Sequence, residues 1–468
     1  MKKQKVGGSP PQNKLLEDHS EQLWGRQTQL SLHYFDIGKQ CFSSAFIHCL
    51  IQIKRACAEV NAENDLLSKT KSQAILTACD ELLMNDYSAQ FPLRIWQTGS
   101  GTQTNMNVNE VICTLANNAI NKQHNPASEQ IHANDHVNMS QSTNDVFPSA
   151  MHMVVATLTH NTLLKSLTYL HDEIAQKQQQ FNAFITVGRT HLMDALPLPV
   201  SAVFSGYCAQ LKQAEAAIDE SLTGVYQLAI GGTAVGGGDN APLDFGPQVA
   251  LKIANKTQLA FKARDNTYAA ISGEDALLRY SSALKQLSTV LFKIANDFRL
   301  LGSGPRCGFN EWLLPSNEPG SSIMPGKVNP TQCEALSMVC LQVLGYELTI
   351  SLAAANGQLQ LNAYRPVIIH NVMESIELLT DVMTSFAKNC VKGLSLNHAQ
   401  VDANMKKNLS VITLLAPKLG YEKSAQIVNI ANSKNISLAE AAEALDLFTV
   451  TEFEALLQQT SHHKAHND

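Results

Sequence analysis

The chemically richest stretch of the chain is residues 317–334, with the sequence NEPGSSIMPGKVNPTQCE. Glycine and proline prevent a regular element there, because proline fixes φ and glycine frees it. We therefore predict a loop of defined geometry that brings two hydroxyls, an ammonium group and an amide to the start of an apolar helix. A hydroxyl beside a cation can ionise, and a helix N-terminus favours negative charge. This set is suited to removing a proton from a carbon next to a carboxylate.

Two other interpretations of this stretch are weaker. Flexible linkers do not usually carry an apolar Ile-Met pair between their glycines and an Asn-Pro after them. A phosphate-binding P-loop has four residues between its glycines and a Ser or Thr after its lysine, whereas Val328 follows Lys327 here.

Three further polar stretches, 98–104, 142–145 and 188–194, lie between apolar segments. Alternating glycines and hydroxyls in the first allow N–H groups and side chains to converge on an anion. One hydroxyl of the second can cap the helix that follows, which leaves its neighbours for binding. His191, beside Thr190, is a candidate acid–base group in the third. Each of these stretches, taken alone, is more often structural.

Together the four stretches supply hydroxyls, amides, one lysine and one histidine, with no Cys-x-x-Cys and no zinc-ligand spacing. We expect no metal and no cofactor. Proton removal would place extra negative charge on the substrate carboxylate, which Lys327, Asn329 and Thr190 can stabilise. Loss of one such donor costs on the order of 3–4 kcal/mol.

The segments that position these loops have the period of amphipathic helices. Apolar residues recur every three or four positions from 145 to 180, in a run well beyond the mean helix length of about 11–12 residues. Similar long helices are predicted at 198–225, 270–300, 331–355 and 365–392, with loops at 186–197, 226–245 and 301–330. Five long helices with few strand signals indicate a mainly α fold around a central bundle.

The chain is expected to form three domains, since its length exceeds that of one ordinary domain. Residues 1–140 form an N-terminal, mainly helical domain and residues 141–396 the central long-helix bundle. Residues 397–468 form a small C-terminal domain of shorter helices, such as 424–433 and 438–444.

Composition limits the partners of the 468-residue chain. Charged residues are 16% of the sequence, below the typical value of about 25%, which suggests that much surface is buried against other copies. The net charge is −6 without a strongly basic run, and we expect neither nucleic acid nor a membrane as a partner. We also expect no apolar run long enough to span a bilayer. Ten scattered cysteines and no secretory signal pattern favour reduced thiols in a cytoplasmic protein.

Five motifs resemble, in the same order, the blocks of class II fumarase in the aspartase/fumarase superfamily. They are WQTGSGTQTNMNVNEVI, SQSTNDVFPSAMH, GRTHLMDALPLP, SGPRCG and GSSIMPGKVNPTQCEAL. The resemblance covers the chain from about Leu23 to its C-terminus. It implies reversible hydration of fumarate to L-malate without a metal or iron–sulfur cluster. It also implies a homotetramer with a twenty-helix core, in which each active site draws loops from three subunits.

By position, the resemblance makes Ser321 the base that removes the C3 proton. It makes His191, held by the carboxylate of Glu334, the group associated with the acid on the other side. It counts Lys327 among the catalytic residues, as a group that holds the substrate carboxylates. The implied substrate-binding residues are Ser100, Gly101, Thr102, Ser142, Thr143, Asn144, Thr190, Ser322, Lys327, Val328 and Asn329.

A second anion-binding site is implied at four consecutive residues, His132, Ala133, Asn134 and Asp135. Ala133 stands where the family usually has proline, which weakens that assignment. Three more departures are Leu30, where the family has arginine, and Gly237 and Asp239, where it has threonine and leucine. None is a residue assigned to chemistry, so we expect weaker substrate affinity or a looser loop at most.

Two alternatives remain beside hydration of fumarate, and a third is excluded. An aspartate ammonia-lyase would use the same proton removal, but the sequence TQCE after Pro330 argues against it. A non-catalytic protein on the same scaffold is opposed by the intact Ser321, Lys327 and His191 and kept open by Leu30 and Asp239. A dinucleotide-binding loop at 231–238 lacks the required strand-then-helix context.

Overall fold

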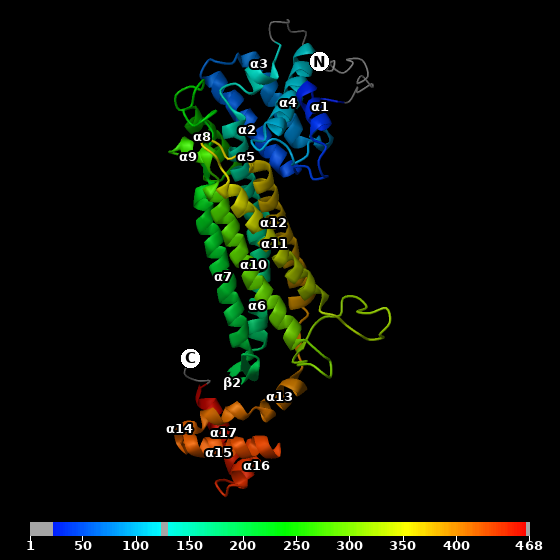
Figure 1. Ribbon diagram of the computed structural model, residues 1–468, viewed down its shortest axis with the longest axis vertical. Coiled ribbons are helices and arrows are strands. Elements are labelled where there is room, and N and C mark those ends of the chain that lie inside the picture. Colours follow the sequence, from blue (N-terminus) through cyan, green and yellow to red (C-terminus); the bar gives the residue numbers. More distant parts are fainter. Residues whose placement is uncertain (1–21, 123–129, 465–468) are drawn as a thin grey trace, which may run out of the picture. The chain divides into compact units, whose positions relative to one another are not determined.

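The computed structural model describes residues 22–122 and 130–464, and it is mainly α-helical (Figure 1). The chain divides into two compact units, each made from three stretches. Unit 1 comprises Met1–Leu158, Ser221–Ser281 and Tyr346–Glu374, and unit 2 comprises Thr159–Glu220, Ser282–Gly345 and Ser375–Asp468. This division follows packing rather than chain order, and the three-domain boundaries stay a prediction.

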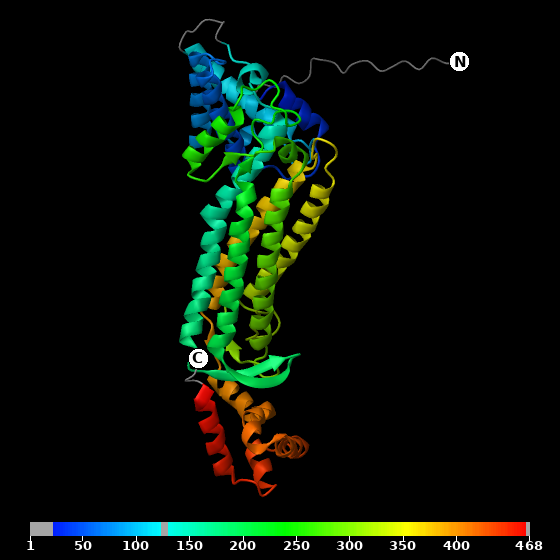
Figure 2. The same cartoon turned by 90° about the vertical axis from the view of Figure 1, so that its left-hand side faces the viewer.

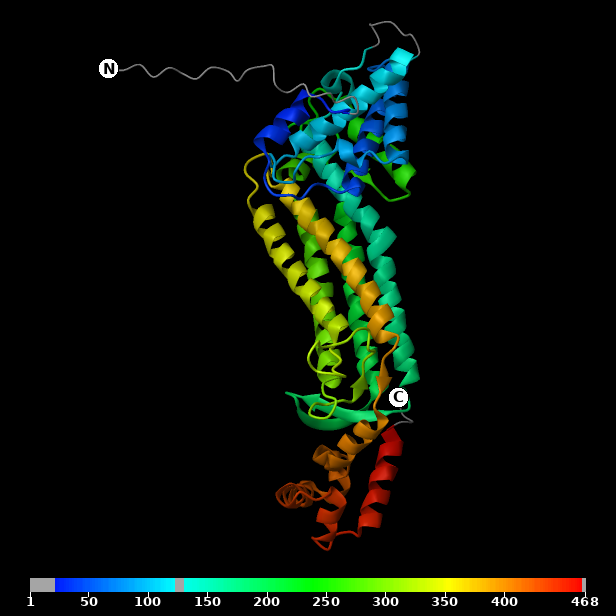
Figure 3. The same cartoon turned by 90° about the vertical axis from the view of Figure 1, so that its right-hand side faces the viewer.

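Unit 1 contains the N-terminal helices and the ends of several long ones. Its helices are α1 (Arg26–Tyr34), α2 (Ser44–Glu63), α3 (Lys69–Met84), α4 (Thr102–Lys122), α5 (Thr143–Leu158), α8 (Phe245–Thr257) and α9 (Thr267–Ser272). A short parallel pair joins β3 (Gln227–Leu228) to β4 (Lys262–Ala263). Helices α2, α3 and α4 lie side by side (Figures 1 and 3). Ile47, Leu50 and Ile51 recur at helical spacing on α2 and are buried, so the amphipathic pattern places α2 in the core.

The five long helices of the bundle are α6 (Leu164–Gln180), α7 (Val200–Val225), α10 (Asp275–Leu301), α11 (Thr331–Ala355) and α12 (Arg365–Phe386). All but α6 contribute residues to both units. In unit 2 aromatic rings hold them together. Phe204 stacks on Trp312 at 5.1 Å between ring centroids, and Phe298 meets Phe386 at 5.2 Å. The helical bundle predicted from periodicity is confirmed.

Two predicted long helices are interrupted. The run 145–180 consists of α5 and α6, separated by a π-helical turn at Thr159–Leu163. Thr159, Asn161 and Thr162 belong to residue types whose side chains compete for backbone hydrogen bonds inside a helix. The run 270–300 is split at Gly273 into α9 and α10.

The segment 186–197, predicted as a loop, is instead part of a β-hairpin, so that prediction was wrong. Strand β1 (Ile185–Thr190) pairs antiparallel with β2 (Met193–Pro199), which is the curved ribbon of Figure 2. Alternation of β-branched residues with polar ones in Ile185–Thr190 carries a strand signal. The two prolines of β2 are tolerated because a two-stranded ribbon has open outer edges.

The C-terminal part of unit 2 is a small cluster of short helices (Figure 3). They are α13 (His398–Lys407), α14 (Ala416–Leu419), α15 (Tyr421–Lys434), α16 (Leu438–Glu443) and α17 (Val450–Lys464). Leu415, Ile427 and Phe453 are fully buried at its centre. Strand β6 (Ser395–Leu396) precedes the cluster and pairs with β5 (Trp312–Leu313).

Helix α11 is long and apolar enough to cross a membrane by length and composition, contrary to the expectation that no such run exists. Its most apolar window has a mean hydropathy of 1.5, and 28% of that window is buried. Four exposed apolar side chains recur at helical spacing on one stripe: Met338, Leu341, Leu348 and Leu352. A single helix of this kind is weak evidence for a membrane span, because core helices of bundles pass the same test. The stripe is an apolar surface that the described part of the chain leaves exposed.

Candidate active site

The predicted site residues divide between the two units. Unit 1 holds the loops 98–104 and 142–145 and the segment 132–135. Unit 2 holds the hairpin turn at 190–191 and the loop 317–334.

The loop 98–104 runs into the first turn of α4. Ser100 Oγ and Thr102 Oγ1 lie 2.8 Å apart, so two hydroxyls stand together where the helix exposes free N–H groups. Gly101 has φ +81°, and a Cβ there would overlap the Phe147 ring, which explains why the position requires glycine. Paired hydroxyls at a helix N-terminus can bind a carboxylate.

The loop 142–145 precedes and opens α5. Ser142 Oγ accepts a hydrogen bond from the Asn144 N–H, and the Asn144 side-chain amide donates to Ala234 O at 2.8 Å. Thr143 is only 8% exposed, so its hydroxyl is the least accessible of the predicted binding groups in this loop. The carbonyl oxygen of the Asn144 side chain makes no hydrogen bond among the described residues.

Asp145 was not assigned a role from the sequence, yet it fixes this loop. It is fully buried, and its carboxylate accepts the N–H groups of Ser142, Gly231 and Thr233, each at 3.0 Å. The carboxylate therefore ties 142–145 to the glycine-rich loop that follows β3. The spacing of a helix-capping serine and a carboxylate three residues later was a signal available in the sequence.

A buried lysine shares the electrostatic environment of Asp145. Lys54 Nζ donates to Asn138 Oδ1 at 2.8 Å and to Gln141 Oε1 at 2.9 Å. Burial raises the pKa of Asp145 to about 6, although the three N–H donors and Lys54 act in the opposite direction. Burial likewise lowers the pKa of Lys54 to about 8. These groups lie beneath the loop and shape it without facing solvent.

The predicted second anion site lies at a π-helical turn, Ala133–Val137. His132, Asn134 and Asp135 are exposed. The His132 N–H donates to His136 Nδ1 at 2.8 Å, and His136 Nε2 lies 3.2 Å from Lys71 Nζ. His136 and Lys71 were not identified from the sequence; the i, i+4 spacing of the two histidines was the available signal, and Lys71 gave none.

His191 occupies the tight turn of the β1–β2 hairpin. His191 and Leu192 both have positive φ, +57° and +62°, and the flanking Thr190 and Met193 form the last pair of the ladder. Positive φ at both central residues matches the twist of a two-residue hairpin turn, but it is uncommon for side chains of this size. His191 is exposed at the tip.

Arg189 anchors this hairpin. Its Nη2 lies 2.6 Å from Glu311 Oε1 and its Nη1 lies 3.1 Å from Oε2, while the guanidinium covers the Phe309 ring at 4.6 Å. Glu311 is buried and also accepts from Asn404 Nδ2 at 2.7 Å. The position of the His191 turn thus depends on a bidentate ion pair, the strongest geometry available to arginine.

The loop 317–330 is held by its own backbone. Gly320 N donates to Lys327 O at 2.9 Å, and Asn329 Nδ2 donates to Gly320 O at 2.6 Å. Ser321 Oγ accepts the N–H groups of Ile323 and Met324, at 3.2 and 3.0 Å. Two N–H donors aimed at one oxygen favour negative charge on it.

The remaining residues of this loop are open to solvent. Ser322, Lys327 and Val328 are exposed, and Ile323 is 82% exposed. Glu334, in the first turn of α11, lies 3.9 Å from Arg299 Nη2. No hydrogen bond in the described part of the chain joins His191 to Glu334 or to Ser321.

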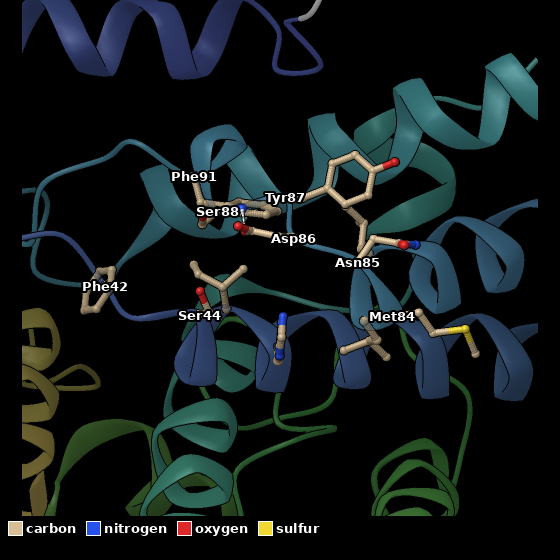
Figure 4. Close-up of a pocket in the computed structure, with 12 residues that line it drawn as sticks. Phe42, Ser44, Met84, Asn85, Asp86, Tyr87, Ser88 and Phe91 are labelled. Carbon is tan, nitrogen blue, oxygen red and sulfur yellow. Dashed lines mark hydrogen bonds between the residues drawn. The ribbon is translucent and has the colours of Figure 1, made fainter.

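Two cavities in the described part of the chain are lined by residues other than those predicted for the site. A cavity of about 300 Å³ lies in unit 1 between α2 and the segment after α3, lined by Ser44, His48 and Asp86 among others (Figure 4). A cavity of about 260 Å³ lies beside the hairpin in unit 2. Neither is lined by a predicted site residue. No group of three or more potential metal ligands occurs among the described residues.

The departures from the expected motifs lie at the surface of unit 1. Leu30 is 38% exposed on α1, and Gly237 and Asp239 are exposed in the loop that Asp145 ties to α5. All ten cysteines are free thiols.

The geometry separates two chemical tasks. Unit 1 offers hydroxyls and an amide on rigidly held loops, which suits binding of an anion. Unit 2 offers a serine oxygen that accepts two N–H groups, a lysine and an exposed histidine, which suits proton transfer.

Comparisons with known proteins identify the family of the chain. Residues 15–345 match the family described as Lyase, and residues 411–460 match the family described as Fumarase C C-terminus. The chain is 48% identical over 441 residues to fumarate hydratase class II of Thermosynechococcus vestitus, covering 94% of both chains. It is 48% identical over 440 residues to fumarate hydratase class II of Pseudomonas syringae, covering 94% of this chain and 95% of the relative.

Two solved structures resemble the whole chain. Class II fumarase from Schistosoma mansoni superposes with a TM-score of 0.92 at 40% identity, covering 96% of this chain and 97% of the other. A fumarate lyase:delta crystallin from Brucella melitensis, bound to cobalt, has a TM-score of 0.89 at 34% identity, covering 94% and 96%.

Proposed function

The chain belongs to the class II fumarate hydratases of the lyase family, and from this premise we propose a mechanism in which the C3 proton of L-malate is removed before the hydroxyl leaves. The reaction proposed for it is the interconversion of fumarate and L-malate, which its similarity to proteins named fumarate hydratase class II supports. The observation that carries the mechanism is the environment of Ser321, whose Oγ accepts two backbone N–H groups.

The first step breaks the C3–H bond. Ser321 Oγ takes the proton, and the electron pair moves into the adjacent carboxylate, which then carries a second negative charge. Lys327 and Asn329 of the same loop, with Thr190 from a hairpin turn, stabilise this charge, because donors fixed in advance need no reorganisation. The Ser321 oxygen is suited to the task because its two N–H partners favour its ionised form.

The second step breaks the C2–O bond. The electron pair returns from the carboxylate to form the C2–C3 double bond, and the hydroxyl takes a proton and leaves as water. His191 is associated with this proton delivery, with Glu334 holding its protonated form. Since no such hydrogen bond exists within the described part of one chain, we propose that His191 and Glu334 come from different subunits.

The other substrate carboxylate is bound by the loops of unit 1. The hydroxyls of Ser100 and Thr102, 2.8 Å apart at the start of α4, and the side chain of Asn144 supply donors to it. The mechanism requires neither metal nor cofactor.

Four copies are proposed to assemble through α11. Its exposed stripe of Met338, Leu341, Leu348 and Leu352 repeats at three, four and seven residues, and Gly345 continues the repeat with open space above it. Such a seam fits a coiled-coil-like contact between helices. The double variant Leu341→Glu and Leu348→Glu is expected to dissociate the assembly, as measured by light scattering. A tetramer that survives both changes would show that another surface holds it.

The function is tested by the ultraviolet absorbance of fumarate. L-Malate is expected to yield fumarate with the wild-type protein, before and after treatment with a chelator, and L-aspartate is expected to yield none. Ser321→Ala is expected to reduce kcat by about 10²–10⁴-fold, the usual contribution of a general base.

Three outcomes would revise the proposal. Fumarate formed from aspartate alone would identify an ammonia-lyase. Loss of activity with the chelator would reveal a metal requirement. Full activity in Ser321→Ala, in a tetramer of unchanged stability, would remove Ser321 from the role of base.

A further inference from the structure

Arg365, the first residue of α12, is completely buried, and its side chain donates to three acceptors from two separate stretches of unit 1. Its Nε donates to Glu274 Oε1 at 2.6 Å, its Nη1 to Asn144 O at 2.9 Å and its Nη2 to Ile271 O at 2.7 Å. The guanidinium therefore holds the backbone of the loop 142–145, which carries predicted substrate-binding groups.

The same residue also holds the other predicted binding loop. The Arg365 backbone N–H, which has no partner inside the helix, donates to Gly99 O at 3.0 Å. A Cβ on Gly99 would overlap the carbonyl oxygen of Ala363, so the two backbones are in direct contact. Pro366 follows Arg365 and fixes the backbone of the first helical turn.

The buried guanidinium of Arg365 needs a counter-charge and hydrogen-bond acceptors in fixed positions. Glu274 is 3% exposed and provides the counter-charge; burial raises the pKa of Glu274, and the Arg365 guanidinium opposes that rise. The remaining contacts are carbonyl oxygens at different edges of the planar guanidinium. Lysine, a point charge on a flexible stem, cannot reach all three acceptors in one plane.

Asp145, the residue after Asn144, also holds the loop 142–145. Its carboxylate accepts three backbone N–H groups, while Arg365 donates to the carbonyl oxygen of the preceding residue. Asn144 is thus held at its carbonyl and through its successor, and its side chain has little freedom.

We propose that Arg365 is a positioning residue for the hydration reaction: it sets the separation between the Ser100 and Thr102 hydroxyls and the Asn144 amide, so that one substrate carboxylate is bound without rearrangement of either loop. This inference rests on the proposed function of these loops in carboxylate binding. Arg365 touches no substrate; it acts through the loops that do. Binding groups that are fixed in advance lose less free energy on binding than groups that must be ordered.

The test compares Arg365→Lys with Arg55→Lys. Arg55 lies in the same unit and makes ion pairs with Asp80 and Glu59, but it has no hydrogen bond to either loop. Since the loops bind the carboxylate in both ground and transition states, Arg365→Lys is expected to raise KM for L-malate by about 10–100-fold while kcat changes less than about threefold. Arg55→Lys is expected to leave both constants unchanged.

Succinate, a dicarboxylate that cannot be hydrated, gives a readout that does not depend on turnover. Calorimetry is expected to show the same fold increase in its Kd for Arg365→Lys as in KM. If the wild-type protein binds succinate but does not turn over malate, the proposed function fails and the positioning role is still measured. An unchanged Kd and KM in folded Arg365→Lys would overturn the inference.

A purely structural role predicts a different pattern. It would lower the folded fraction, so activity per milligram would fall while KM and the succinate Kd stay the same. If Arg365→Lys fails to fold, Glu274→Gln decides between the two roles, because it removes the counter-charge that fixes the guanidinium and so loosens the contact of Arg365 with Asn144 O. A rise in KM with kcat retained supports positioning, and a fall in active fraction with unchanged KM overturns it.

Discussion

The binding loops of unit 1 and the loop 317–330 of unit 2 are built in opposite ways. The first are held by buried charges, Asp145 and Arg365, whose partners come from distant parts of the chain. The second is held mainly by hydrogen bonds within itself, such as Gly320 N to Lys327 O, with a bond from Asn317 Nδ2 to Asn389 O at its start. Most of its side chains are exposed.

Because of this difference, changes in the unit 1 loops and changes in the loop 317–330 are expected to affect stability and activity differently. Groups on the unit 1 loops cannot move without breaking a buried network, so changes there affect folding and binding together. The unit 2 loop contributes few contacts to the fold, and regions of this kind open at low cost. Residues that transfer protons can therefore lie on a segment that adapts, while the anion is held by one that does not.

Among the substitutions that compare the two regions, the largest effect is expected at Lys327, where activity should fall while stability is unchanged. Lys327→Gln removes an exposed cation that we assign to the charged intermediate. Activity, kcat/KM for L-malate, is expected to fall by about 10²–10³-fold, the usual cost of one donor to a developing charge. The urea midpoint should not change. A parallel loss of stability would show that this loop is part of the folding core. The loop 317–330 and the unit 1 loops would then not differ in their contribution to the fold.

Two glycine substitutions compare how much the two loops contribute to the free energy of unfolding. Gly99→Ala places a Cβ against the carbonyl oxygen of Ala363, and the forced backbone shift is expected to cost about 2–3 kcal/mol in the free energy of unfolding. Gly326→Ala, at φ +77° with no atom within 4 Å of the new Cβ, should cost about 1 kcal/mol from backbone strain alone.

Urea denaturation of both glycine variants measures these costs. Gly99→Ala is also expected to raise the KM for L-malate, because its loop binds the substrate. Equal losses of stability in the two variants would mean that the two loops are equally integrated into the fold.

The smallest effect is a pH dependence of the free energy of unfolding that arises from Asp145 in unit 1. The pKa of Asp145 is raised to about 6 in the fold, against about 3.9 for an unfolded aspartate. The native state then binds more protons between these values, so this group's contribution to stability is full below about pH 4 and is lost as the pH rises through about 6. The carboxylate retains its three N–H donors above that range.

Asp145→Asn should remove this slope. The measurement is the free energy of unfolding from urea titrations between pH 4 and 8, with the wild-type protein as the reference. Identical slopes in the two proteins would show that Asp145 does not titrate in this range, and Lys54 would then be the group to test.

Several features could be read from the sequence because they depend on local interactions. The bounds of α11, 331–355, follow from apolar periodicity and from the Asn329-Pro330 pair before it. The loop 317–330 follows from its glycines and prolines, and the hydroxyls of 98–104 fall at a helix start as expected. The Lyase match confirms the family that the ordered motifs resemble.

Other features required the tertiary structure. Arg365 and Asn144 are 221 residues apart in the chain, and Asp145 and Thr233 are 88 apart, so no spacing or period connects them. The β1–β2 hairpin was missed because its glycine and prolines are typical of a loop, and only the pairing of two edges turns it into a ribbon. The roles of Ser321, His191 and Glu334 stay predictions, because no hydrogen bond among the described residues brings the three side chains together.

The sequence by itself determined the helical bundle, the family and the chemical groups available for proton removal. Those properties follow from residue type and from contacts within a few positions along the chain. The tertiary structure was needed to identify the buried charges that hold the predicted binding loops and the hydrogen bonds that hold the loop 317–330. The physical reason is that a buried ion or carbonyl finds its partner through space, and the position of that partner in the sequence is free to vary.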